Sequence, residues 1–245
     1  MSVPDLVPVN PLFYKNPQVL SAQQHGNWRL VPGNAKFCAA AIGVPIVISE
    51  FGDVSRSSPI LFGVGDDFGP IALTGLADRN LYVNDDTWEP NTYVPAYVRR
   101  YPFGLASVAD DASRLVLVVD VDSDLLVKEG TEGIALFEGL EPSQFTKDAL
   151  KFCESWHQET FSTQAFRDAL RAKNLLENRR VNGTFANGKT FEVEGFQIID
   201  VKKLTELDDA TVIDWHRKGW LASCYYHLAS LNRMNDLIAR AAKNP

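Results

Sequence analysis

Histidine and carboxylate side chains are the first candidates for chemistry in this sequence. The histidines are His25, His157, His216 and His227. The run His157-Gln158-Glu159 has the spacing that opens a two-histidine, one-carboxylate iron site. Its surroundings have helical character, and residues two apart on a helix point about 200° apart, so these side chains do not converge on one ion. We therefore expect no metal site and no cofactor.

Two histidines remain candidates for ligand binding. His227 lies in "SCYYHLASL", where a partly buried, hydrogen-bonded histidine is the ordinary interpretation. His25 comes just before Gly26 and Trp28, where it either binds a ligand or caps a turn. One enzyme hypothesis joins His25, Glu50 and His227 as the iron ligands of a non-haem oxygenase.

A second candidate is the stretch "YVPAYVRRYPFGL" at residues 93–105, which sets Arg99 and Arg100 among aromatic rings. Arginine in such a setting pairs with a carboxylate or stacks on a ring. The stretch forms either a strand or a short helix that begins at Pro95 and ends before Pro102. Three roles stay open: an internal ion pair that fixes a loop, an anion-binding site, or a protein interface. Candidate partners for the arginines are Glu50, Asp85, Asp86 and Glu89.

The adjacent acidic residues and the cysteines are weaker candidates for a functional site. General acid–base chemistry needs two carboxyl groups that face one cleft, whereas adjacent acids in turns and helix caps are usually solvated. The three cysteines show no C-x-x-C spacing, so we expect neither a disulfide framework nor a zinc site. The acidic pairs are Asp66-Asp67, Asp85-Asp86, Asp110-Asp111 and Asp208-Asp209, and the cysteines are Cys38, Cys153 and Cys224.

Composition excludes several classes of partner. The 245 residues are 45% hydrophobic and 22% charged, which is the balance of a globular protein with its own core. The net charge of −7 disfavours nucleic acid and anionic membranes, because both are bound by clustered lysine and arginine. No apolar run approaches the roughly 20 residues of a membrane span, so we expect no membrane insertion.

The N-terminal stretch favours a cytoplasmic location. Residues 1–20 carry prolines at 4, 8, 11 and 17 and lack a basic segment followed by an apolar run, so they do not form a signal peptide. We expect an extended, proline-stiffened arm whose apolar side chains pack on the rest of the chain. The sparse, odd number of cysteines fits a reducing compartment.

Strands dominate the expected structure of residues 26–137. Short apolar runs rich in β-branched residues are separated by polar turns. The strongest is "SRLVLVVDV", and "VPIVISEFGDVSRSS" is ambiguous between strand and helix. "GVGDDFG" is expected to be a turn. The remaining expected strands lie at 27–31, 59–64, 70–76 and 80–84.

Helices dominate the remainder. Ser143 is an expected helix N-cap, with Ser162 or Thr163 capping a second helix. Asn-Gly pairs at 182–183 and 187–188 predict the turns of a hairpin whose later strand covers 191–201. The C-terminal helices are expected to run from a cap at Asp208 to Gly219 and over 220–243. We predict an α+β fold with a mainly antiparallel β N-terminal half and a helical, hairpin-containing C-terminal half. Residues 21–245 form one domain, in which the hairpin joins the first sheet.

Several quoted segments resemble the bacterial SapC family. "YVPAYVRRYPF", preceded by "NLYVNDDTW", resembles its signature, and "VPIVISEF" followed by "SPILF" resembles a second conserved segment. "FQIIDVKKLTELDDATVIDWHRKGWLASCYYHLASLNRMNDLIAR" resembles its C-terminal block. The resemblance covers nearly the whole chain after about residue 10. It implies a link by name to a bacterial surface layer and gene neighbours that resemble tryptophan-halogenase flavoproteins and cupin-like oxygenases. It supplies no catalytic residues.

These observations lead to three functional hypotheses. The first is a cytoplasmic accessory or binding protein that recognises a peptide or a partner enzyme, such as a tryptophan-halogenase-like flavoprotein. The second is the non-haem iron oxygenase, and the third is a surface-layer-associated structural protein, which the missing export signal disfavours. The expected ligand-binding residues are Arg99, Arg100, Tyr93, Tyr97, Asn80, Glu50, His25 and His227.

Overall fold

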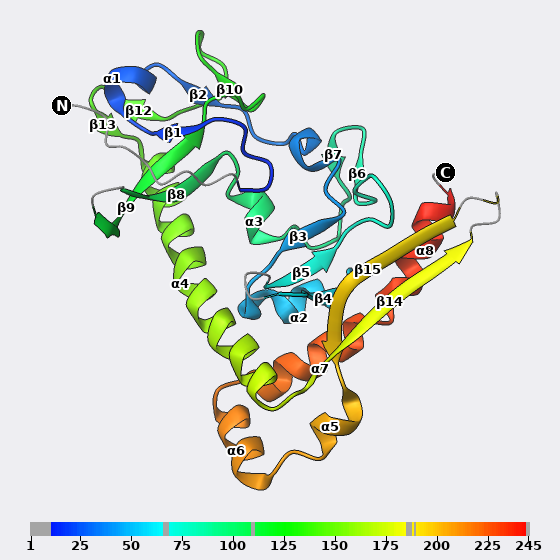
Figure 1. The fold of residues 1–245 in the computed structure, drawn as a ribbon. Helices are drawn as coiled ribbons and strands as arrows, with labels where there is room; N and C mark the ends of the chain where they lie inside the picture. Colours follow the sequence, from blue (N-terminus) through cyan, green and yellow to red (C-terminus); the bar gives the residue numbers. More distant parts are fainter. Residues whose placement is uncertain (1–10, 66–68, 109–110, 185–187, 189, 244–245) are drawn as a thin grey trace. The chain divides into compact units, whose positions relative to one another are not determined.

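The structure is a computed structural model that describes residues 11–65, 69–108, 111–184, 188 and 190–243 (Figure 1). The chain divides into two compact units. Unit 1 contains Met1–Cys38 and Val98–Gln158, and unit 2 contains Ala39–Tyr97 and Glu159–Pro245. Two of the three boundaries fall inside helices, α3 (Ala96–Arg99) and α4 (Gln144–Ala172), and the third follows Cys38. The predicted arm over 1–20 and single domain over 21–245 stay predictions.

Unit 1 is built on a three-stranded antiparallel sheet in the order β1-β9-β8. Its central strand, β9, is the strongest strand predicted from the sequence. The end of the proline-rich arm supplies β1, which pairs with β9 from Pro17↔Asp120 to Val19↔Val118. A second sheet has the order β10-β2-β11, and β12 pairs with β13. The bounds are β1 (Pro17–Val19), α1 (Ala22–His25), β2 (Arg29–Leu30), η1 (Lys36–Cys38), β8 (Phe103–Val108), β9 (Asp111–Asp120), β10 (Leu126–Val127), β11 (Ile134–Ala135), β12 (Phe137–Glu138) and β13 (Glu141–Pro142).

The first half of α4 covers the core of unit 1. Ser143 caps the helix as expected, because its hydroxyl oxygen accepts the N–H of Thr146 at 3.3 Å. On the inner side of this helix Cys153 is buried, and Phe145 and Ala149 pack against the same core. The buried members of this core are Leu30, Phe103, Val119, Val121, Leu126, Leu136, Phe137 and Cys153.

Unit 2 contains a five-stranded sheet in the order β14-β15-β4-β5-β3. The long β14–β15 hairpin, which comes late in the sequence, joins the earlier strands through Phe196↔Gly63 and Gln197↔Phe62 (Figure 1). The expectation that the hairpin rejoins the first sheet is therefore confirmed. The bounds are β3 (Gly43–Pro45), η2 (Ile48–Glu50), α2 (Phe51–Val54), β4 (Ile60–Gly63), β5 (Pro70–Leu73), β6 (Val83–Asn84), β7 (Thr87–Trp88), β14 (Leu176–Thr184), β15 (Thr190–Ile199), α5 (Val201–Thr205), α6 (Asp209–Arg217), α7 (Trp220–Ser230) and α8 (Arg233–Lys243).

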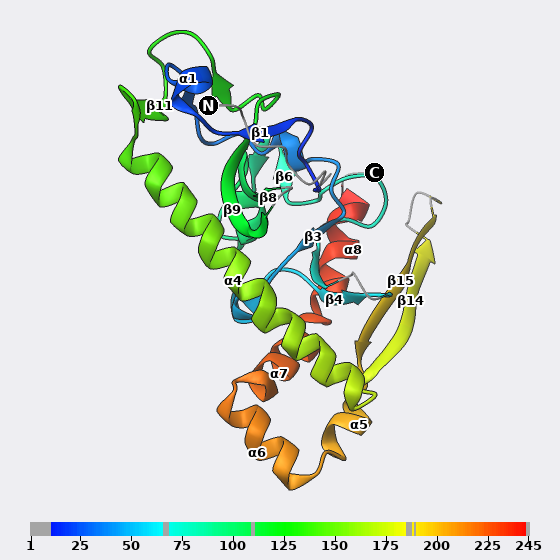
Figure 2. The same cartoon turned by 60° about the vertical axis from the view of Figure 1, so that its left-hand side comes forward.

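Apolar side chains cover both faces of this sheet, as strand alternation requires. Ile60 and Phe62 of β4 belong to one core, which also receives residues from α2, α6, α7 and the second half of α4. Leu61, between them, belongs to the other core, where Leu237 of α8 is fully buried. Figure 2 shows α7 and α8 following one another beside these strands. The sheet of unit 2 thus has helices packed on two faces.

The second predicted helix cap is wrong, because α4 continues through Ser162 and Thr163 as one helix of 29 residues. The Thr163 hydroxyl donates to the carbonyl of Glu159 at 2.7 Å and accepts the N–H of Ile48 at 2.9 Å. A threonine hydroxyl that bonds back one turn is compatible with a helix interior. The sequence cannot show this, because the second bond comes from a residue 115 positions away.

The predicted turn at Asn182-Gly183 is also wrong. Both residues lie inside β14, where Gly183 pairs with Phe191. A Cβ atom at Gly183 would lie 2.8 Å from a ring carbon of Phe191, so the glycine gives room to an aromatic side chain. The other predicted turn includes Asn187, which lies outside the described residues, as does part of "GVGDDFG".

The C-terminal helices are confirmed in part. α6 begins after Asp208, whose side chain accepts the N–H of Thr211, and it ends before Gly219 with φ of 74°. The expected single helix over 220–243 is instead two, α7 and α8. Between them the N–H groups of Leu231 and Asn232 bond to carbonyls three residues back, which is the tighter 3₁₀ pattern.

The predicted fold class is confirmed: strands dominate the N-terminal half, and helices with one hairpin dominate the C-terminal half. In the part of the chain that the structure describes, no helix has the length and apolar character of a membrane span.

Candidate ligand-binding site

The stretch at residues 93–105 contains the short helix α3 and the start of strand β8. The helical alternative therefore holds for residues 96–99, and the strand alternative is wrong there. Pro95 precedes the helix, and the peptide bond between Tyr101 and Pro102 is cis. Two tyrosines of this stretch, Tyr93 and Tyr101, each bind a buried carboxylate.

Glu50 is the carboxylate in unit 2. It is 4% exposed and lies at the junction of η2 and α2. Its Oε1 atom accepts the Tyr93 hydroxyl at 3.0 Å and the Ala96 N–H at 2.7 Å, while Oε2 accepts the Val47 N–H at 2.9 Å. Glu50 and Tyr93 were both expected in a site, and the structure brings them together. Their bonds fix the loop that leads into α3.

Asp120 is the carboxylate in unit 1, and the sequence analysis missed it. It is fully buried and accepts the Tyr101 hydroxyl at 2.8 Å. It also accepts the N–H groups of Lys15 at 3.1 Å and Asn16 at 2.8 Å, so it holds the end of the N-terminal arm. Burial, with the nearby Asp120 charge, raises the pKa of Tyr101, so its hydroxyl stays a donor. The available signal was a lone acid inside the apolar run "VLVVDV".

The two arginines of the stretch contact aromatic rings in unit 1. The guanidinium of Arg100 lies 4.1 Å from the ring centroid of Trp156 and 5.8 Å from that of Tyr14. Arg99 is exposed and lies 5.2 Å from the ring centroid of Phe152. Ring stacking was one of the two expected roles for these arginines. Of their candidate carboxylate partners, Glu89 pairs with Arg240.

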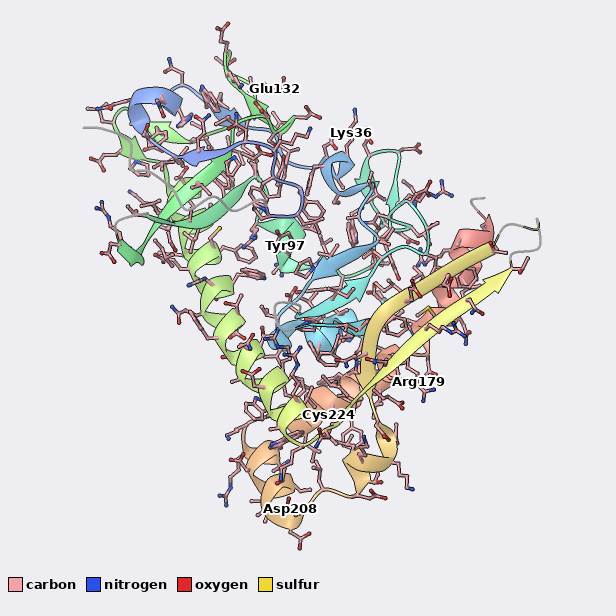
Figure 3. The ribbon with its side chains drawn as sticks, viewed as in Figure 1. Lys36, Tyr97, Glu132, Arg179, Asp208 and Cys224 are labelled. Carbon is pink, nitrogen blue, oxygen red and sulfur yellow. The ribbon has the colours of Figure 1, made fainter. Side chains whose placement is uncertain are left out.

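Tyr97 and Asn80, the other expected site residues from unit 2, are buried. Tyr97 lies within α3 (Figure 3) and is 5% exposed. The side-chain oxygen of Asn80 accepts the N–H of Tyr82 at 2.9 Å, which is the bond of a local turn. Neither residue lines the two clefts described below.

Comparison with known proteins supports the resemblance found in the sequence. The family model described as SapC matches residues 20–237, which is nearly the whole chain. The chain belongs to the SapC family. No curated protein and no solved structure matches it. In this SapC protein, the stretch at residues 93–105 supplies the tyrosines of both tyrosine–carboxylate pairs.

Each unit of the SapC chain also buries one of the expected histidines. His25, 2% exposed, accepts the Ser21 N–H on Nδ1 at 3.1 Å, so it caps a turn. His227, fully buried, accepts the Ile199 N–H on Nε2 at 3.1 Å. Burial lowers the pKa of both imidazoles, that of His227 to about 3. Both rings are therefore neutral near pH 7.

The ligands of the oxygenase hypothesis are distributed over the two units, with His25 in unit 1 and Glu50 and His227 in unit 2. Among the described residues, no group of three or more His, Cys, Asp or Glu side chains is arranged to hold a metal ion. His157 and Glu159 lie in α4, as the argument against their convergence assumed.

The three thiols have the character of core side chains. None of the three forms a disulfide, and all are buried (Figure 3 labels Cys224 on α7). Burial raises the pKa of the Cys38 and Cys224 thiols to about 12 and that of Cys153 to about 11. A thiol with so high a pKa is a poor nucleophile at neutral pH.

An open cleft of about 750 Å³ lies in unit 1, between α1, β2 and the loop that joins β10 to β11. Arg29 and Lys128 line it with Trp28 and Glu129. The Lys128 ammonium lies 5.0 Å from the Trp28 ring centroid, and the Trp28 ring packs edge-on against the buried His25. His25, a candidate from the sequence, packs against the lining residue Trp28, whereas no sequence pattern indicated the cleft itself. The remaining polar side chains of its lining are Gln23, Gln24 and Asn27.

A second cleft, of about 450 Å³, lies in unit 2 beside α8. Two cations line it, Arg240 and Lys243. Arg240 forms an ion pair with Glu89 and lies over the Tyr82 ring at 4.7 Å. Asp236 adds a further negative charge to the lining. The Arg240 charge is thus already compensated, which distinguishes this cleft from that of unit 1.

Proposed function

We propose that this SapC protein is a cytoplasmic accessory protein that recognises a peptide or a partner enzyme through the cleft of unit 1. The observation that carries the proposal is this cleft's size and polar lining. A volume of about 750 Å³ lies within the range of ligand sites. Its charged and amide side chains suit a ligand with many hydrogen-bonding groups, such as a peptide.

The hydrogen bonds of the buried carboxylates and the pKa of the buried histidine support a binding role over a catalytic one. Glu50 and Asp120 each accept three hydrogen bonds that join separate parts of their units. His227 has a pKa of about 3, far below the range in which a general base works. Three cysteines that form no disulfide agree with a reducing compartment.

The test is a binding measurement with purified proteins. A tryptophan-halogenase-like flavoprotein and an array of immobilised peptides are each presented to the intact chain and to two charge reversals. We expect binding that Lys128→Glu abolishes and that Lys147→Glu leaves unchanged, because Lys147 is an exposed lysine on α4 outside the cleft. Equal signals for the intact chain and Lys128→Glu would contradict recognition through this cleft.

A further inference from the structure

The cations of the unit 1 cleft remain available for a ligand. In the described residues, neither Arg29 nor Lys128 forms an ion pair. Arg29 donates Nε to the carbonyl of Gly133 at 3.0 Å, and its terminal nitrogens make no hydrogen bond with described residues. This single bond orients the guanidinium and leaves its terminal donors for an anion.

Both cations line this one cleft. Arg29 on β2 pairs with Val127 on β10, so Lys128 is the next residue beyond the paired position. Gly133 lies across from them with φ of 88°, and a Cβ atom there would lie 2.5 Å from the carbonyl oxygen of Leu30. Only glycine lets the loop pass this close to β2 while its carbonyl holds Arg29. At the tip of the same loop, Glu132 projects outward (Figure 3).

The remaining lining limits the charge of the ligand. Two cations and Glu129 give the lining a net charge of +1, which suits a monoanion better than a phosphate dianion. Glu129 is an acceptor for an N–H group, and the side-chain amides of Gln23, Gln24 and Asn27 both donate and accept. A carboxylate whose neighbouring atoms include amide N–H and C=O groups satisfies all of these groups.

We propose that the unit 1 cleft binds the terminal carboxylate and last amides of a peptide, held by Arg29 and Lys128 and packed beside Trp28. This inference rests on the proposed function and specifies its ligand. The same chemistry is offered by a short free peptide and by the C-terminus of a protein. The ligand carboxylate accepts hydrogen bonds from the Arg29 guanidinium and the Lys128 ammonium. The last N–H group of the peptide donates a hydrogen bond to Glu129.

The experiment compares N-acetyltrialanine, which has a free carboxylate, with its C-terminal amide. Binding to the full chain is followed by the NMR signal of the Trp28 indole N–H, assigned with Trp28→Phe. We expect the free acid to shift this signal and the amide to bind roughly tenfold more weakly, the contribution of one charge-assisted hydrogen bond. Lys128→Gln should weaken the acid to a similar extent, while Lys147→Gln should not. The same three residues at the C-terminus of a carrier protein show whether a protein end also fits.

Three results would overturn this inference. Equal binding of the free acid and the amide would show that the cleft does not recognise the carboxylate, while recognition of the peptide itself would stand. Loss of binding when trialanine is N-acetylated would mean that Glu129 holds an ammonium group, which is a different ligand class. If neither peptide shifts the Trp28 indole signal at millimolar concentration, the cleft does not bind peptide ends. The flavoprotein measurement, which does not depend on a free carboxylate, would then judge the proposed function separately.

Discussion

Each unit buries one carboxylate that accepts two backbone N–H groups and one tyrosine hydroxyl. Glu50 and Tyr93 form this arrangement in unit 2, and Asp120 and Tyr101 form it in unit 1. The difference lies in how far the donors are along the chain. Glu50 bonds to Val47, three residues away, whereas the donors to Asp120 are 19, 104 and 105 residues away. Asp120 therefore holds separate segments of unit 1 together, while Glu50 also stabilises its own turn.

In the stretch at residues 93–105, the tyrosines and not the arginines bind the buried acids. The adjacent arginines were the prominent feature in the sequence, and in the structure their guanidinium groups lie over aromatic rings. The tyrosines on either side of them hold the buried acids, one in each unit. Tyr101 comes eight positions after Tyr93, so one short stretch supplies a hydrogen-bonding tyrosine to each unit.

Removal of the buried acids is the strongest way to test the comparison. Asp120→Ala leaves the buried Tyr101 hydroxyl and two part-buried N–H groups without an acceptor, and we expect it to cost about 4 kcal/mol of unfolding free energy. Glu50→Ala should cost about 3 kcal/mol, because Val47 is close enough in sequence to relax toward another acceptor. Chemical denaturation measures both, with exposed Asp122→Ala as the control. A larger loss for Glu50→Ala would contradict the ranking.

Much of the fold was predictable from local patterns. β9 followed from its β-branched run, α6 from Asp208 and Gly219, and the start of α4 from Ser143. Glu50 lies within reach of a backbone N–H only three residues back, so its role had a local signal.

What was missed depends on partners far along the chain. Nothing near Asp120 in the sequence indicates that residues 15 and 16 bond to it. The uninterrupted α4 depends on the bond between Thr163 and Ile48, and the strand at Gly183 depends on the Phe191 ring. The cleft of unit 1 joins residues 22–29 with 128–139, which no spacing rule connects.

The buried histidines extend the comparison to pH. A pKa of about 3 for His227 in the folded chain, against 6.5 when unfolded, means that the unfolded state binds the extra proton as pH falls below 6.5. The contribution of neutral His227 to the unfolding free energy is therefore fully present above pH 6.5. It decreases between pH 6.5 and pH 3, by about 1.4 kcal/mol per pH unit. The shift of His25 has the same sign, so unit 1 weakens in the same direction.

The measurement is the unfolding free energy between pH 7 and pH 4.5 for the intact chain and His227→Gln. Glutamine keeps an acceptor for Ile199 but does not titrate, so its stability should fall less steeply with acid. If this variant does not fold, the imidazole C–H shifts of the intact chain report the His227 pKa directly. Parallel pH curves, or an imidazole that titrates near 6.5, would contradict the assignment.

Removal of the tyrosine hydroxyls tests whether Tyr93 and Tyr101 hold the buried acids through their hydrogen bonds. Tyr101→Phe should cost about 2 kcal/mol, because the hydroxyl is buried and bonds to a carboxylate at 2.8 Å. Tyr93→Phe should cost about 1 kcal/mol, because its site is only partly buried. Thermal denaturation gives both values, and Tyr225→Phe, at an exposed position on α7, is the matched control. Two changes as small as the control would show that the hydroxyls do not hold the acids.

The arginines should give the smallest effects, and the two should differ. Arg100 is half-buried and lies 4.1 Å from the Trp156 ring centroid, so Arg100→Ala should cost about 1 kcal/mol through lost stacking. Arg99 is exposed over Phe152, and Arg99→Ala should stay within about 0.5 kcal/mol. Arg100→Lys separates the contribution of charge from that of stacking, because lysine keeps the charge and lacks the planar stacking surface. If lysine restores full stability, charge rather than stacking explains Arg100. A loss of several kcal/mol for Arg99→Ala would instead restore the arginines, rather than the tyrosines, as the main anchors of the signature.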